Sequence, residues 1–175
     1  MKPQPAIFFD RDGVLNTDIG YAFLPEHITW VDGAMDAIKL ANEHGYLVFV
    51  ATNQSGIARG MYTESHVAQL HTWMQQECLS RSAVIHSFAF CPHHPTEGHG
   101  AYKVDCNCRK PAPGMLLSLA KNNSIDMSRS MMIGDKESDM GAAKAAGITG
   151  HMFTGGNLAK FLETILASQE MSSRT

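Results

Sequence analysis

Short apolar runs alternate along this chain with segments that have the spacing of amphipathic helices. We expect strands at residues 6–9, 46–51, 87–90, 131–133 and 148–153. Helices are expected at residues 33–44, 63–78, 113–122, 138–146 and 158–167. Strands and helices in alternation predict a mostly parallel sheet with helices on both faces. The fold class is therefore α/β, a three-layer sandwich of the Rossmann type, in which ligands bind at the carboxyl ends of the strands.

Length and composition restrict the function. With 175 residues, of which 44% are hydrophobic and 18% charged, we expect one globular domain spanning residues 1–175. The net charge of −3 argues against nucleic acid as a partner, since no basic excess is present to neutralise phosphates. No apolar run approaches the roughly 20 residues that span a bilayer, and the first residues lack a signal-peptide pattern. We therefore expect a cytoplasmic chain with no membrane partner.

Polar residues follow three of the expected strands. The first strand ends in Asp10-Arg11-Asp12-Gly13, the second in Thr52-Asn53-Gln54-Ser55, and the fourth in Gly134-Asp135-Lys136. If the strand continued through them, Asp10 and Asp12 would share one face. With Asp135 they would then form a cluster of repelling carboxylates, which Mg²⁺ would neutralise. The alternative is that these residues only form turns and helix caps.

Four motifs in this order resemble the haloacid dehalogenase (HAD) superfamily of phosphatases. They are Asp10-x-Asp12-Gly13, Thr52, Lys110, and the acidic segment from Asp135 to Asp139. The resemblance implies that Asp10 is a nucleophile that forms an aspartyl-phosphate, and that Asp12 is the general acid and base. It also implies that Thr52 and Lys110 stabilise the phosphoryl group.

The same resemblance implies a catalytic Mg²⁺ held by Asp10, Asp135 and the backbone carbonyl of Asp12. We interpret Asp139 as a supporting or helix-face carboxylate and not as a ligand.

Cysteines and histidines crowd one segment that has no helical or strand periodicity. Cys91 and His93 form one pair with a single residue between them, and Cys106 and Cys108 form another. Two such pairs can hold a structural Zn²⁺ in tetrahedral geometry, with no position left for water. His94 is the alternative to His93, and unrelated loop residues are the alternative to a site. We expect this zinc loop, at about residues 91–110, to be a small insertion that serves in place of a large cap domain.

Cys78 lies outside this group. It shares an apolar helix face with Val67, Leu70 and Met74, so we expect it in the core.

Within the superfamily, two families carry such a zinc loop: the heptose-bisphosphate 7-phosphatases and the histidinol-phosphate phosphatases. The segments at residues 10–16, 52–60, 91–95 and 108–115 resemble the heptose enzymes. The implied substrate is therefore a small sugar bisphosphate that loses its C7 phosphate on the route to ADP-heptose and lipopolysaccharide.

This resemblance also implies a set of substrate-binding residues: Asp18, Ile19, Gly20, Tyr21, Asn53, Gln54, Ser55, Arg109 and Lys136. Several of them have alternatives. Asn53 orients Asp12 or its loop, or is a plain turn residue. Arg109 binds the distal phosphate or is a surface charge, and Lys136 reaches phosphate or pairs with a carboxylate. The competing functions are histidinol-phosphate phosphatase and a non-catalytic phosphosugar-binding protein. We expect a monomer.

Overall fold

The computed structural model describes residues 2–173 and contains a five-stranded sheet. Its strands are β1 (Ala6–Phe9), β2 (Leu47–Asn53), β3 (Ser87–Cys91), β4 (Met131–Gly134) and β5 (Thr149–Met152). All neighbouring pairs are parallel and follow the order β3-β2-β1-β4-β5. The expected parallel sheet is therefore confirmed. The chain moves outward from β1 to β3 and then returns beside β1, so the order reverses between β1 and β4, where such sheets bind ligands.

The helices agree with the sequence pattern to within a few residues at most ends. They are α1 (Ala34–Glu43), α2 (Glu64–Ser80), α3 (Gly114–Asn123), α4 (Glu137–Ala145) and α5 (Leu158–Ser172). Short 3-10 helices occupy Pro25–His27, Gly100–Tyr102 and Met127–Arg129. The last helix continues past its expected end at residue 167, because its polar residues lie on an exposed face and do not break it. In the described part of the chain, no helix is long and apolar enough to cross a membrane.

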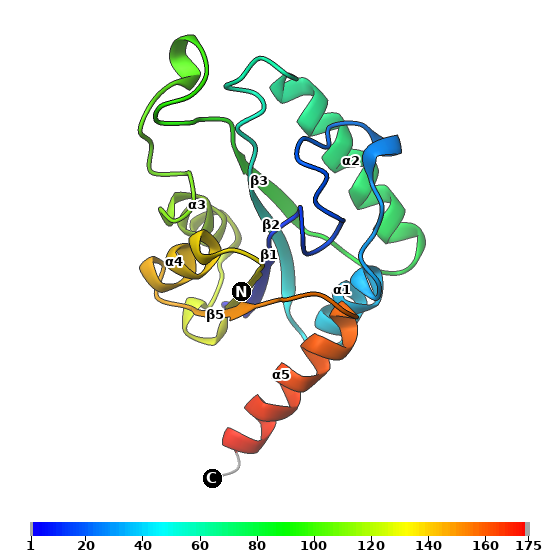
Figure 1. Cartoon of the computed structure of the whole chain (residues 1–175). Coiled ribbons are helices and arrows are strands. Elements are labelled where there is room, and N and C mark those ends of the chain that lie inside the picture. The colour runs from blue at the N-terminus through cyan, green and yellow to red at the C-terminus, as the bar shows by residue number, and fades with distance from the viewer. Residues whose placement is uncertain (1, 174–175) are drawn as a thin grey trace.

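Helices lie on both sides of the sheet, as Figure 1 shows, and an apolar layer fills the space on each side. Ile7 and Phe9 of β1 point to one face, where they pack with residues of α1 and α5 and with Cys78 of α2. Ala6 and Phe8 point to the other face, which α3 and α4 cover. This alternation is the two-residue period of a strand buried on both sides. The three-layer sandwich is confirmed, and Cys78 is fully buried, as expected for a core residue.

The irregular segments gather at the carboxyl edge of the sheet. The segment from β3 to α3, green in the upper part of Figure 1, extends beyond this edge. It contains one short 3-10 helix, and residues 2–173 include no large cap domain. β2 continues beyond the expected end at residue 51, because Thr52 and Asn53 pair with Phe90 and Cys91 of β3. This pairing brings the start of the green segment next to the end of β2.

Candidate active site and cysteine–histidine cluster

A cavity of about 370 Å³ lies at the carboxyl ends of the strands. Most of the predicted site residues line it: Asp10, Asp12, Asp18, Gly20, Tyr21, Thr52, Asn53, Gln54, Ser55, Arg109, Lys110 and Lys136. Tyr62, Ser138 and Asp139 complete the wall. Ile19 does not line the cavity, and its side chain is 59% exposed. The volume suits a small polar molecule.

Lys110 lies buried between two carboxylates in the floor of the cavity. Its Nζ is 2.8 Å from Asp10 Oδ1 and 2.6 Å from Asp139 Oδ1, and it donates a third hydrogen bond to the Ala51 carbonyl at 2.7 Å. All three ammonium hydrogens therefore have partners. Burial disfavours the charged ammonium, but the two carboxylates prevail and raise the pKa of Lys110. The lysine is thus a permanent cation beside Asp10.

Asp10 follows the last residue of β1 and is only 6% exposed. Its Oδ1 accepts from Lys110 and from the backbone N–H of Arg11. Burial raises the pKa of the Asp10 carboxyl to about 7, with Lys110 opposing and the charges of Asp139 and Asp135 adding to the rise. Such a pKa marks a carboxylate whose negative charge is incompletely compensated. The site therefore favours a bound cation.

Asp135 supplies a second observation that favours a cation. Its Oδ1 is buried and, among the described residues, has no hydrogen-bond partner. Carboxylate oxygens of Asp10, Asp135 and Asp139 lie within 4.8 Å of one another. Gly13 permits this approach, because a Cβ there would lie 2.1 Å from Asp135 Oδ2. Clustered hard oxygens with one unsatisfied atom fit Mg²⁺.

The expectation that the Asp12 side chain joins this cluster is wrong. β1 ends at Phe9, so the strand rule that placed Asp10 and Asp12 on one face does not apply. The Asp12 carboxylate instead accepts hydrogen bonds from Arg11, from Asn16 at 2.9 Å and from Gln54 at 2.9 Å. Asp139 takes the third place in the cluster. It pairs with Lys110, and its Oδ2 accepts from the backbone N–H groups of residues 135 and 136.

Arg11 is a site residue that the sequence interpretation did not include. It is fully buried, and its NH2 donates to Asp12 Oδ1 at 3.1 Å and to Oδ2 at 3.0 Å. NH1 contacts His71 Nε2 at 3.1 Å, and burial lowers the pKa of that histidine well below 6.5. The position of Arg11 between two acidic residues was a usable signal, whereas nothing in the sequence marks His71.

The adjacent amide side chains of Asn53 and Gln54 bind different parts of the site. The Asn53 side chain accepts from the backbone N–H of Lys110 at 3.0 Å and donates to its carbonyl at 3.1 Å. Asn53 therefore fixes the peptide backbone of Lys110 and does not contact Asp12. Gln54 contacts Asp12, and it also donates to Thr52 Oγ1 at 2.8 Å.

Two loops close the sides of the cavity. Lys136 Nζ lies 3.2 Å from Asp18 Oδ2, and Asp18 Oδ1 accepts from the N–H of Gly20 at 2.9 Å. Of the two alternatives for Lys136, the structure therefore contains the carboxylate pair, and the lysine still lines the cavity. Arg109 donates to the His93 carbonyl at 3.3 Å, which ties one cavity wall to the cysteine–histidine segment.

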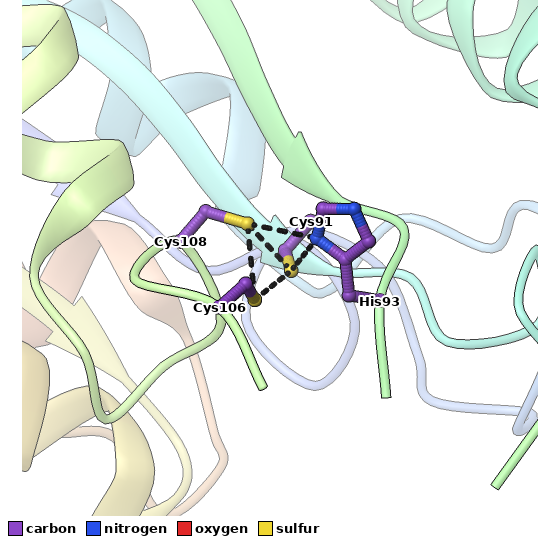
Figure 2. Close-up of side chains that lie close together, drawn as sticks. All are labelled: Cys91, His93, Cys106 and Cys108. Atoms are coloured by element: carbon purple, nitrogen blue, oxygen red, sulfur yellow. Dashed lines mark hydrogen bonds between the residues drawn. The ribbon is translucent and has the colours of Figure 1, made fainter. Parts of the chain in front are cut away.

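The cysteine–histidine cluster consists of Cys91, His93, Cys106 and Cys108. Figure 2 shows their side chains pointing toward one point, from the end of β3 and from the segment that leads to α3. The sulfur–sulfur distances are 2.9, 3.4 and 3.5 Å, and His93 Nδ1 is 3.3 Å from Cys108 and 3.7 Å from Cys91. Tetrahedral Zn²⁺ with these donors has edges of about 3.5–3.8 Å. Four of the five distances lie within or close to that range, and the Cys91–Cys108 distance of 2.9 Å is shorter. The donor set and its convergence therefore fit a structural zinc ion once these two sulfurs move apart.

The three thiols differ in their pKa values. Burial raises the pKa of Cys91 and of Cys108. Burial also opposes ionisation of Cys106, but hydrogen bonds from Cys108 and from backbone groups lower the pKa of Cys106 to about 7, toward the thiolate that binds metal. His94 Nδ1 accepts instead from the N–H groups of Thr96 and Glu97 and shapes a turn. His93 is therefore the histidine placed in the cluster.

This sheet order is typical of the HAD-like hydrolases, together with an acidic residue after β1, a lysine from the segment between β3 and α3, and acidic residues after β4. The HAD-hydrolase-like family model matches residues 107–166. A D-glycero-β-D-manno-heptose-1,7-bisphosphate 7-phosphatase from Rhodopseudomonas palustris is 46% identical over 97% of this chain and 94% of its own length. The chain belongs to the family of these heptose-bisphosphate phosphatases.

Two other relatives agree. The enzyme of the same name from Escherichia coli K12 is 44% identical over 84% of this chain and 77% of its own length. A solved structure of a D,D-heptose 1,7-bisphosphate phosphatase from B. bronchiseptica, complexed with magnesium and phosphate, is 32% identical. It superposes with a TM-score of 0.76 over 91% of this chain and 86% of that one.

Proposed function

We propose that this protein hydrolyses the C7 phosphate ester of D-glycero-D-manno-heptose 1,7-bisphosphate. We propose the β anomer as the preferred form, because the names of the relatives specify it. The observation that carries the proposal is Asp10. It is a buried carboxylate at the end of β1, held by Lys110, in the same cavity as the second carboxylate, Asp12.

In the first half of the reaction, an Asp10 carboxylate oxygen attacks phosphorus. The bond between phosphorus and the C7 oxygen breaks, and Asp12 gives its proton to that leaving oxygen. Asp10 then carries the phosphoryl group as an aspartyl-phosphate. Lys110 and the Thr52 hydroxyl stabilise the negative charge on the other phosphoryl oxygens.

In the second half, Asp12 is a carboxylate and takes a proton from water as that water attacks phosphorus. The bond from phosphorus to Asp10 breaks, and inorganic phosphate leaves. Arg11, Asn16 and Gln54 donate hydrogen bonds to Asp12 and hold its carboxylate in place in this half. A single residue can serve both steps because each step returns it to the protonation state that the other requires.

The remaining site residues are assigned by position. Asp10, Asp135 and the backbone carbonyl of Asp12 would hold Mg²⁺, whose charge, when it is bound, offsets repulsion between the Asp10 carboxylate and the phosphate dianion. Arg109 and Lys136 would contact the sugar or its distal phosphate, together with Asp18, Gly20 and Tyr21. Asn53 would act only through Lys110. The exposure of Ile19 makes it the weakest member of the set.

We also infer a structural Zn²⁺ in the cysteine–histidine cluster, where four ligands leave no position for water. A role on the route to ADP-heptose and lipopolysaccharide, a single domain, a cytoplasmic location and a monomeric state stay predictions.

A substrate panel tests the proposal. It contains both anomers of the heptose bisphosphate, histidinol phosphate, fructose 1,6-bisphosphate and simple monophosphates, compared by kcat/KM. We expect the heptose bisphosphate to give the highest value and Asp10→Asn to abolish release of phosphate. A higher kcat/KM for histidinol phosphate would show that the heptose bisphosphate is not the substrate. Absence of Asp10-dependent release from every ester would favour a non-catalytic phosphosugar-binding protein.

A further inference from the structure

The side-chain amide of Gln54 has a partner for each of its polar hydrogens and for its oxygen. Gln54 is 3% exposed. Its Nε2 donates to Thr52 Oγ1 at 2.8 Å and to Asp12 Oδ2 at 2.9 Å, and its Oε1 accepts from the Tyr62 hydroxyl at 2.6 Å. An amide that turned by 180° would place its oxygen against the Asp12 carboxylate. The partners therefore define one orientation.

The Tyr62 hydroxyl is the hydrogen-bond donor to Gln54 Oε1. Burial raises the pKa of Tyr62 to about 12, so the hydroxyl keeps the proton that it donates. Gly56 allows this contact because a Cβ there would lie 2.2 Å from the Tyr62 ring.

The ring of Tyr62 is held independently of its hydroxyl. It is 5% exposed and stacks on Phe23, with ring centroids 5.0 Å apart and an angle of 18° between the rings. Removing the hydroxyl therefore leaves the ring in place. It deprives Gln54 Oε1 of its partner and removes one of the three hydrogen bonds that hold the amide in its orientation.

The consequence reaches Thr52. A threonine hydroxyl that accepts from Gln54 keeps its own proton for another acceptor. Thr52 lines the cavity, so that acceptor is a phosphoryl oxygen of the bound substrate. With the amide turned, its oxygen would face Thr52 and take the proton away from the phosphoryl group.

We propose that Tyr62 is a positioning residue for phosphoryl transfer. Its hydroxyl fixes Gln54 so that Thr52 donates its proton into the cavity and Asp12 keeps a hydrogen-bond donor. This inference rests on the proposed phosphatase function and adds to it a residue whose hydroxyl acts through Gln54. The charge on the phosphoryl oxygens develops most fully in the transition state, so the effect falls on kcat more than on KM.

The test compares Tyr62→Phe with the parent enzyme, both with full metal content. We expect kcat to fall about 10- to 100-fold, less than the loss on deleting a direct donor, on both the heptose bisphosphate and p-nitrophenyl phosphate. KM should change less than about threefold. The melting temperature should fall by only a few degrees, because one buried hydrogen bond is lost. Tyr102→Phe is the matched control, since it removes a hydroxyl that bonds Glu64 at 2.9 Å on the surface, and it should be neutral.

A double-mutant cycle separates a relay from independent effects. Gln54→Leu should lower kcat at least as much as Tyr62→Phe, and the double variant should be no worse than Gln54→Leu alone. Additive losses, or a Tyr62→Phe enzyme with the kcat of the parent, would overturn the inference. The rate of phosphate release by Asp10→Asn is the baseline. If the parent enzyme releases phosphate no faster than Asp10→Asn from either ester, the proposed phosphatase function itself is wrong, and not only the role of Tyr62.

Discussion

Replacing the proposed nucleophile should make the metal-free protein more stable at neutral and basic pH. Asp10 is buried beside two other carboxylates, and its pKa is raised from 3.8 to about 7. Between those values the folded protein holds a proton that the unfolded chain has released. Stability from this group is therefore fully present below pH 4 and is lost as the pH rises through 7. Asp10→Asn removes that loss.

The magnitude follows from the shift. A shift of roughly three pKa units, at about 1.36 kcal/mol each, lowers the free energy of unfolding by about 4 kcal/mol at pH 8. The same relation gives a loss of about 2 kcal/mol at pH 5. At about 2–4 °C per kcal/mol for a chain of this size, the variant should melt about 8–16 °C above the parent at pH 8. The variant should be inactive at the same time, because the group that destabilises the fold is the group that attacks phosphorus.

The assay is thermal and urea unfolding from pH 5 to 8 on protein dialysed free of Mg²⁺, with zinc content checked on each sample. The control is Asp36→Asn, which removes the same charge at an exposed position and should shift stability by less than about 1 kcal/mol. Added Mg²⁺ should stabilise the parent more than Asp10→Asn and narrow the gap, since a ligand stabilises the state that binds it.

Two results would refute this reasoning. One is a pair of parallel stability curves for parent and Asp10→Asn between pH 5 and 8. The other is a variant less stable than the parent at pH 8. Either would mean that Lys110 compensates the Asp10 charge fully and that the cluster does not need a cation.

Other substitutions test other parts of the molecule. Lys110→Met leaves two buried carboxylates without their cation and should lower the free energy of unfolding by about 3–5 kcal/mol and abolish phosphate release; unchanged urea unfolding would contradict this. Cys108→Ser should lower the zinc content from about one ion per chain to nearly none, whereas Cys78→Ala should keep it, as measured by mass spectrometry. Because burial lowers the pKa of His71, the folded protein loses stability as the pH falls below 6.5. His71→Gln should reduce that loss, and equal urea midpoint shifts between pH 7 and 5 would argue against the buried contact with Arg11.

Local patterns were enough to predict the sheet, whereas most of the cavity lining came from the resemblance to a known family. Apolar runs, helical spacing and the helix-capping residues are encoded within a few positions of each element. The rule that parallel strands present ligand-binding residues at their carboxyl ends then brought Asp10, Thr52 and Asp135 together without any knowledge of contacts. The same holds for the cysteine–histidine cluster, where residue type and spacing define the ligand set. Lys110 came only from the resemblance to the HAD superfamily.

The failures have one physical cause: they depend on where the backbone turns. The interpretation placed Asp12 in the carboxylate cluster by continuing the first strand to that residue. Because β1 ends at Phe9, the Asp12 side chain lies elsewhere, and Asp139 joins the cluster. Asn53 and Gln54 are adjacent amides, and only the end of β2 decides which one faces Lys110 and which faces Asp12. Tyr62 gives no signal in the sequence, since its partner is defined by the close approach that Gly56 allows.

The cysteine–histidine cluster and the reaction site share one segment of backbone. Lys110 must hold its Nζ between two carboxylates, yet it lies in a segment with no regular secondary structure. Asn53 fixes the Lys110 backbone from one side, and the hydrogen bond from Gly114 N–H to the Asn107 carbonyl at 2.8 Å closes the loop on the other. The cluster holds the rest of that loop, which buries too few apolar side chains to order itself. If the proposed zinc ion is bound there, its removal should therefore act on catalysis through the position of Lys110, before the sheet itself is affected.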